Sequence, residues 1–196
     1  TVCMLLLGLA YFSTTSTTYA FGSAIKERTF PEKAVTFLDE VGVKGRMFNS
    51  YSIGGYLIWR APDRKVFIDG RAKHVYSPEF YEQYEKMLED PAIWEKVDNE
   101  WGFNYAVLEY DMRDGGKHFA FHLNDNAAWA LVYWDNHSAV YVKRNLLNKR
   151  IIDNYEYKIT KPKQYDFIYL NKFTGSPNER IEALNQIIKE IDLNQE

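Results

Sequence analysis

Two short stretches of this 196-residue chain carry side chains that could bind a ligand. The first runs from Asn49 to Tyr56 and contains Tyr51 and the paired glycines Gly54 and Gly55. Paired glycines allow close backbone approach, and exposed N–H groups in such a turn can bind an anion. The stretch is not GxGxxG, and no P-loop lysine follows it. Two interpretations stay open, an anion site and a glycine pair that only permits tight packing at a helix start.

The second stretch is Asp69-Gly70-Arg71, with His74 close behind. It follows an expected strand at 65–68, and in open α/β sheets ligands collect at the carboxyl ends of strands. A carboxylate, a guanidinium and an imidazole at that point could bind a phosphate or a sugar. Alternatively, Asp69 only caps the following turn and pairs with Arg71. The sequence predicts that both stretches face a single polar cleft, in which they bind the substrate.

Other chemistries have little support. His118 and His122 are spaced i, i+4, but zinc would need a third ligand and there is neither HExxH nor a nearby cysteine. We therefore interpret them as surface histidines and expect no metal and no cofactor. No GxSxG motif occurs, and Cys3 is the only cysteine, which excludes an intrachain disulfide. These patterns assign no catalytic residue.

Helix signals occur at four places. Pro31, followed by apolar residues at helical spacing, predicts the first helix. Ser77-Pro78 and Asp90-Pro91 each combine an N-cap with a proline and predict two more. The fourth begins at Ser176, which fits a capping box with Glu179. Its apolar stripe must be buried against another element, and consists of Ile181, Leu184, Ile187, Ile188 and Ile191.

Short apolar runs between the helices predict strands, at 46–48, 65–68, 105–108, 130–134 and 139–143. The last two flank Asp135 to Ser138, which is typical of a hairpin turn. The alternation predicts an α/β fold with a mostly parallel sheet and an antiparallel edge hairpin, flanked by helices. Residues 145–175 show no convincing period, so we expect them to be irregular.

The first twenty residues predict a membrane anchor. Val2 to Phe12 is apolar without a charge, and the chain starts at Thr1 without a methionine. Because about 20 apolar residues are needed to cross a bilayer, we expect 1–20 to be the end of a transmembrane helix in contact with membrane lipid. A signal peptide ending near Ala20 is one alternative, and a buried N-terminal helix is another.

The rest of the chain suits one extracytoplasmic domain at the cell membrane. We expect 21–150 to form the α/β domain, and 151–196 an irregular crossover and a C-terminal amphipathic helix. The composition of 46% hydrophobic, 26% charged and 16% aromatic residues is that of a folded protein with an aromatic core. The net charge of −3, with scattered Lys and Arg, argues against nucleic-acid binding.

Three blocks of the sequence look like a known family: Phe30 to Val35, Phe48 to Trp59 with GGYLIW, and Val66 to Arg71 with VFIDGR. They resemble the C-terminal soluble domain of predicted bacterial polytopic membrane proteins of the GT-C glycosyltransferase type, over residues 29 to 145. More distantly, the chain is similar to the catalytic subunit of oligosaccharyltransferase, in which a WWDYG-like motif helps to bind the acceptor. This chain has no Trp-Trp-Asp at the corresponding place, Tyr51 to Tyr56.

The resemblance implies an accessory or acceptor-facing domain of an integral-membrane glycosyltransferase whose donor is a polyprenyl-phosphate sugar. In GT-C enzymes the catalytic carboxylate typically lies in an extracytoplasmic loop near the start of the membrane region. The resemblance therefore implies that this stretch of chain has no turnover alone. A non-catalytic ectodomain for recognition or scaffolding is the alternative, and a secreted hydrolase is a third hypothesis.

Overall fold

The computed structural model describes residues 30–110, 119–163 and 176–194 of the chain. In these ranges four strands form one sheet, in the order β1-β2-β4-β3. The strands are β1 (Arg46–Asn49), β2 (Phe103–Glu109), β3 (Trp129–Trp134) and β4 (Ser138–Lys143). β1 pairs parallel with β2, whereas β4 pairs antiparallel with β2 and with β3. The described sheet is thus mixed rather than mostly parallel, and the expected hairpin is confirmed as β3 and β4.

The segment at 65–68, which we expected to be a strand, is not one. It lies beside the end of β1, where the Asn49 side chain takes the place of a strand neighbour. Asn49 Oδ1 accepts from the Phe67 N–H (2.8 Å), and Nδ2 donates to the Ile68 carbonyl (2.8 Å). Phe67 and Ile68 are buried as expected for an apolar run. No strand forms because one side-chain amide supplies the bonds that a backbone ladder would make.

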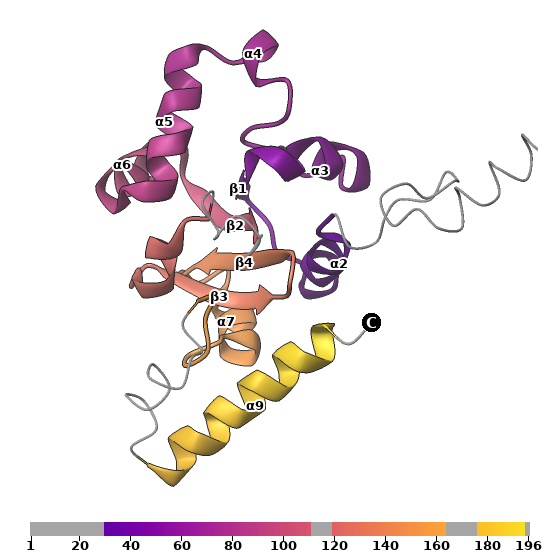
Figure 1. Ribbon diagram of the computed structural model, residues 1–196, viewed down its shortest axis with the longest axis vertical. Coiled ribbons are helices and arrows are strands. Elements are labelled where there is room, and N and C mark those ends of the chain that lie inside the picture. Colours follow the sequence, from indigo (N-terminus) through magenta and orange to yellow (C-terminus); the bar gives the residue numbers. More distant parts are fainter. Residues whose placement is uncertain (1–29, 111–118, 164–175, 195–196) are drawn as a thin grey trace, which may run out of the picture.

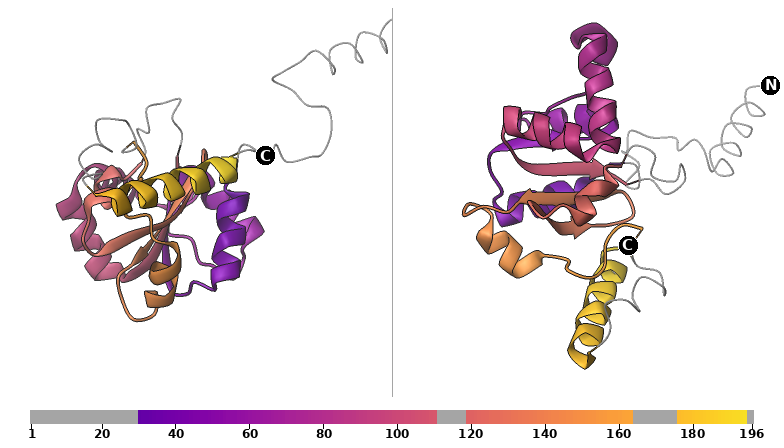
Figure 2. Two further views of the ribbon diagram at one scale, coloured as in Figure 1. Left: turned by 90° about the horizontal axis from the view of Figure 1, so that it is seen from below. Right: turned by 90° about the vertical axis from the view of Figure 1, so that its left-hand side faces the viewer.

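Helices cover both faces of the sheet (Figures 1 and 2). The helices against the sheet are α2 (Glu32–Val41), α3 (Gly54–Arg60), α5 (Pro78–Glu89), α6 (Pro91–Trp101) and α7 (Lys149–Tyr155). On β2, Ala106 and Leu108 pack in the core under α5 and α6, while Tyr105 and Val107 pack in the core under α2, α3 and α7. This alternation follows the period of two that a strand imposes. The fold is therefore a three-layer α/β arrangement.

The helix ends follow the capping signals of the sequence. α2 ends at Gly42, which takes the left-handed conformation (φ 68°), and its N–H donates to the Leu38 carbonyl. Ser77 Oγ accepts from the Phe80 N–H at the start of α5 (3.2 Å), and Asp90 Oδ1 accepts from the Ala92 N–H at the start of α6 (2.8 Å). The first three expected helices are confirmed.

The C-terminal helix α9 (Pro177–Asn194) lies beyond β3 and α7 (Figure 1). Its capping box is present, since the Ser176 N–H donates to Glu179 Oε2 (2.9 Å) and the Glu179 N–H donates to Ser176 Oγ (3.3 Å). The apolar stripe, however, is between 44% and 57% exposed against the described residues at Ile181, Leu184, Ile188 and Ile191. The expected burial of this stripe is not observed, because α9 contacts the domain through another face.

That other face is centred on Gln186, which is 5% exposed. Its Oε1 accepts from the backbone N–H groups of Ile159 (3.0 Å) and Thr160 (2.9 Å). Ala183, on the same side of the helix, is buried as well. Polar bonds of one side chain therefore attach α9 to the segment that follows α7.

Two further expectations concern the ends of the domain. Residues 145–175 are not irregular throughout, because 149–155 form α7 and bury Ile151 in the core. The expected anchor at 1–20 lies outside the described residues. Among the helices that the structure describes, none is long and apolar enough to cross a membrane.

Candidate functional site

The candidate site lies at the C-terminal ends of the parallel strands β1 and β2. The short helix η1 (Tyr51–Ile53) begins directly after β1 and is tied to the end of β2. The Ser50 N–H donates to the Val107 carbonyl (3.1 Å), and Ser50 Oγ accepts from the Glu109 N–H (2.9 Å). Ser52 also donates to the Glu109 carboxylate. These bonds fix the backbone that carries Tyr51.

Gly54 brings the first turn of α3 against the chain at 68–69. A Cβ atom on Gly54 would lie 2.1 Å from the Ile68 carbonyl oxygen and 2.9 Å from the Asp69 Cβ. A Cβ atom on Gly55 would have no other atom within 4 Å. The structural interpretation of the glycine pair therefore applies to Gly54, which joins the two predicted stretches by direct packing.

Asp69 is buried, with 1% exposure, and its carboxylate is fully used. Oδ1 accepts from the Arg71 N–H (3.0 Å) and Nε (2.8 Å), and Oδ2 accepts from Arg71 Nη2 (2.8 Å) and the Tyr76 hydroxyl (3.0 Å). These bonds, above all those from the Arg71 guanidinium, hold the pKa of Asp69 well below its usual range. Because a carboxylate offers about four acceptor sites, a ligand would find none free. Asp69 orients Arg71.

Arg71 is the exposed member of this pair. Its side chain is 64% exposed, although Nε and Nη2 are fixed by Asp69. The two-point contact sets the plane of the guanidinium and leaves Nη1 outside the ion pair. Arg71 therefore offers oriented donors at the surface, which suits a phosphate or a sugar hydroxyl.

Beside this pair lies a cleft of about 450 Å³, which we call the tyrosine cleft. It is lined by three tyrosines and two glutamates together with a serine and a proline, which are Tyr51, Tyr76, Tyr81, Glu82, Glu85, Ser77 and Pro78. The rings of Tyr51 and Tyr81 meet edge to face at 5.6 Å. The Tyr51 hydroxyl donates to the Gly70 carbonyl (3.3 Å), and the Tyr51 N–H donates to the Tyr84 hydroxyl (2.9 Å). The walls of the cleft are therefore held in place by hydrogen bonds.

The structure brings together five of the eight predicted site residues, Asn49, Tyr51, Gly54, Asp69 and Arg71. It does not bring Tyr56 or His74 to them, and Gly55 borders open space in the first turn of α3.

Tyr56 lies in the core under α2, stacked on Phe30 at 4.7 Å, and its hydroxyl donates to Glu32. His74 is exposed on the short helix α4 (Ala72–Val75). Asn49, fully buried, has a structural role as the amide that holds 67–68. Of the predicted binding residues, Tyr51 thus lines the tyrosine cleft, and Arg71 is exposed outside its lining.

The tyrosine cleft includes residues that we did not predict. Tyr81 and Glu85 are spaced i, i+4 on α5, beside the stripe that faces the core, and Tyr76 stands just before the Ser77 cap. Their spacing was available as a signal, because two residues at i, i+4 share one helix face. What the sequence does not reveal is that this face meets Tyr51.

Histidines contribute no metal site to the described residues. His122, which we interpreted as a surface residue, is half-buried, with Nε2 2.8 Å from the Met87 carbonyl oxygen and its ring 5.5 Å from that of Trp94. Burial lowers the pKa of His122. His118 lies outside the described residues. Within the described ranges, no group of three or more His, Cys, Asp or Glu side chains could hold a metal ion.

No protein-family model, no curated protein and no solved structure matches this chain. The functional argument therefore depends on the geometry of the tyrosine cleft and of Arg71.

Proposed function

We propose that this chain is the extracytoplasmic, acceptor-facing domain of an integral-membrane glycosyltransferase that uses a lipid-linked sugar donor. The observation that carries the proposal is the tyrosine cleft beside Arg71. Aromatic faces bind the C–H faces of sugar rings, and carboxylates such as Glu85 accept hydrogen bonds from sugar hydroxyls. The resemblance of the GGYLIW and VFIDGR blocks to the GT-C type supports the same function.

Within this proposal the domain recognises a saccharide and does not catalyse its transfer. A general acid or base needs a pKa near the working pH. Asp69 does not meet this requirement, because Arg71 holds its pKa low and its acceptor sites are occupied. The catalytic carboxylate would therefore be supplied elsewhere in the enzyme. The same observation favours, as a second candidate, a non-catalytic ectodomain that binds a saccharide on a membrane protein.

The first test is saccharide binding by the 196-residue chain. We expect at least one member of a panel of bacterial cell-surface oligosaccharides to bind, measured by titration calorimetry. Tyr81→Ala removes one wall of the cleft and should weaken that binding about tenfold, the order of one aromatic contact. Tyr155→Ala is the matched control, because Tyr155 is a half-exposed tyrosine outside the cleft. Equal binding by the two variants, or no binding by any saccharide, would contradict the proposal.

A second measurement separates the two candidates. Sugar transfer is assayed in membranes that contain the complete protein with Tyr81→Ala or Tyr155→Ala. In a glycosyltransferase, Tyr81→Ala lowers transfer at limiting acceptor concentration, and Tyr155→Ala does not. If the unchanged protein binds the saccharide but shows no transfer, the chain belongs to a non-catalytic ectodomain.

A further inference from the structure

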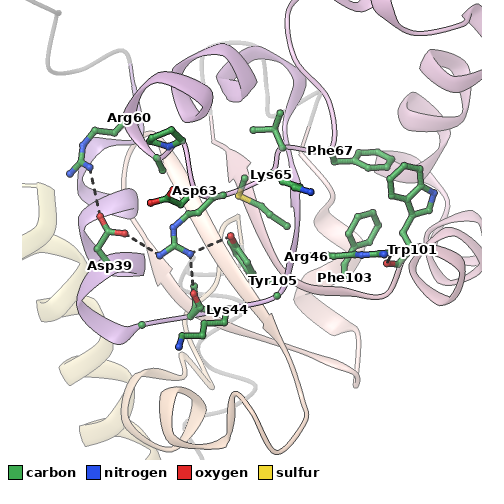
Figure 3. Close-up of a pocket in the computed structure, with 18 residues that line it drawn as sticks. Asp39, Lys44, Arg46, Arg60, Asp63, Lys65, Phe67, Trp101, Phe103 and Tyr105 are labelled. Atoms are coloured by element: carbon green, nitrogen blue, oxygen red, sulfur yellow. Dashed lines mark hydrogen bonds and ion pairs between the residues drawn. The ribbon is translucent and has the colours of Figure 1, made fainter.

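A second and larger cavity, of about 900 Å³, lies at the N-terminal ends of β1 and β2, whereas Tyr51 and Glu109 lie at their C-terminal ends. Figure 3 shows the residues that line it. Its lining includes the first residues of β1 and β2, together with the loop after α2 and the chain from 60 to 67. Because β1 and β2 are parallel, their N-terminal ends lie at one end of the sheet and their C-terminal ends at the other. We call this cavity the basic pocket.

The basic pocket concentrates positive charge on a chain whose net charge is −3. Its lining has five cationic side chains, from Lys44, Arg46, Arg60, Arg64 and Lys65, and two carboxylates, from Asp39 and Asp63. Such an excess of one sign in a concave surface attracts ions of the opposite sign.

Two of the five cations are already engaged. Asp39 pairs with Arg60 (3.7 Å) and with Arg64 (3.0 Å). Arg64 also donates to the carbonyls of Leu38 and Val43, which closes the end of α2. Figure 3 shows the ion pair of Asp39 with Arg60 at one end of the pocket. Arg60 and Arg64 are therefore structural.

The other three cations pair with no carboxylate of the described residues. Each stands in or next to a segment that hydrogen bonds or close packing hold in place. The Lys44 carbonyl accepts from the Asn104 side chain, and the following Gly45 (φ 101°) is packed so closely that its Cβ would lie 2.7 Å from Asn104 Cβ. Arg46 Nη1 donates to the Trp101 carbonyl (2.6 Å). Lys65 precedes the segment that Asn49 holds. Of these cationic groups, the Arg46 guanidinium is held in place by a side-chain hydrogen bond, and a group that is already positioned loses less entropy when it binds a ligand.

Aromatic rings line the side of the basic pocket where Arg46 lies, as Figure 3 shows. The Trp101 ring packs edge-on against Phe67 at 4.9 Å and parallel to Phe103 at 6.3 Å. Trp101 is partly exposed, so its ring can contact a ligand. The pocket thus combines a cationic surface with an apolar one.

We infer that the basic pocket binds an organic diphosphate, with the phosphate oxygens at Arg46 and Lys65 and the organic group against Trp101. These three side chains lie on one side of the pocket in Figure 3, whereas Lys44 points away from them. A diphosphate carries enough charge to meet two cations from separate segments, whereas a single carboxylate does not. This site is independent of the saccharide cleft and of its residues.

The test is a calorimetric titration of the 196-residue chain with inorganic pyrophosphate and with ADP, which adds a planar group. We expect both to bind, ADP more tightly, and both to weaken as salt is raised, because exposed charges are screened. Lys65→Ala should weaken both ligands about tenfold, since hydrogen bonds between charged groups are the stronger ones.

The matched control is Lys96→Ala, which removes the same charge from an exposed lysine of α6 outside the pocket. Circular dichroism verifies that both variants fold. Equal affinities of the two variants would overturn the inference, because binding would then follow net charge alone. Failure of both pyrophosphate and ADP to bind would overturn it as well, and neither result bears on the saccharide cleft.

Discussion

The Asp69 carboxylate accepts hydrogen bonds at both oxygens. Two of these bonds hold the Arg71 guanidinium in one orientation, and the Arg71 side chain is exposed to solvent. The charge that matters for a ligand is thus the guanidinium, while the carboxylate serves the fold. Removing the carboxylate charge should therefore change stability, and change ligand binding through Arg71.

We predict that Asp69→Asn lowers the free energy of unfolding at pH 7 by about 1.5–3 kcal/mol, because an amide nitrogen cannot accept the bonds that Arg71 and Tyr76 donate. The pKa of Asp69 is lower in the folded state than its ordinary value of 3.8. Its ionised form therefore stabilises the fold above that value, and this contribution is lost as the pH falls below it. Urea unfolding at pH 7 and pH 3 measures the change.

Asp63→Asn is the control, since Asp63 is an exposed carboxylate. It should leave stability unchanged at both pH values. If Asp69→Asn behaved like the control at pH 7, the carboxylate would not be structural.

At the residue scale, sequence predicts the pairing of Asp69 with Arg71 because they are two positions apart. It does not predict the Tyr76 hydroxyl, which decides that no acceptor site stays free. Tyr56 fails as a predicted site residue for a related reason. Its position in the first turn of α3 directs its side chain into the core, and the local sequence does not show which side of the helix faces the core.

At the scale of elements, the packing of α3 requires that residue 54 has no Cβ atom. We predict that Gly54→Ala lowers the free energy of unfolding by about 3 kcal/mol or more, because the new methyl group would overlap the Ile68 carbonyl. Gly55→Ala has open space and lies in the same helix, so it should stabilise by about 0.5–1 kcal/mol. Thermal unfolding of both variants measures the difference. Similar values for the pair would contradict the packing described here.

Elements with local signals were predictable, and elements that need a distant partner were not. The starts of α5 and α6 are set by caps within a few residues, and the β3–β4 hairpin is set by its turn. The 65–68 segment has the composition of a strand but depends on Asn49, eighteen residues away from Phe67. The strand order likewise depends on β4 pairing antiparallel with β2, about thirty residues earlier in the chain. Apolar runs do not encode that pairing, so they could not predict the mixed sheet.

For the whole molecule, the attachment of α9 is the least expected feature. We predict that Gln186→Ala lowers the free energy of unfolding by about 1–3 kcal/mol, because the Ile159 and Thr160 N–H groups would be left buried without an acceptor. Leu184→Gln, on the exposed stripe of the same helix, should change it by less than about 0.5 kcal/mol. Urea unfolding of both variants measures these effects. A larger loss for Leu184→Gln would mean that the stripe is covered in solution.

The Asn49 amide also has a consequence for hydrogen exchange. The Phe67 N–H lies in no strand, yet it is buried and bonded to a single side chain. Its exchange with solvent deuterium therefore reports whether one side chain is in place, while the amides of β2 report the opening of the sheet. In Asn49→Ala the Phe67 amide would exchange fast while the centre of β2 stayed protected. The exchange rate of this one amide thus measures local opening of the 65–68 segment, which borders the basic pocket.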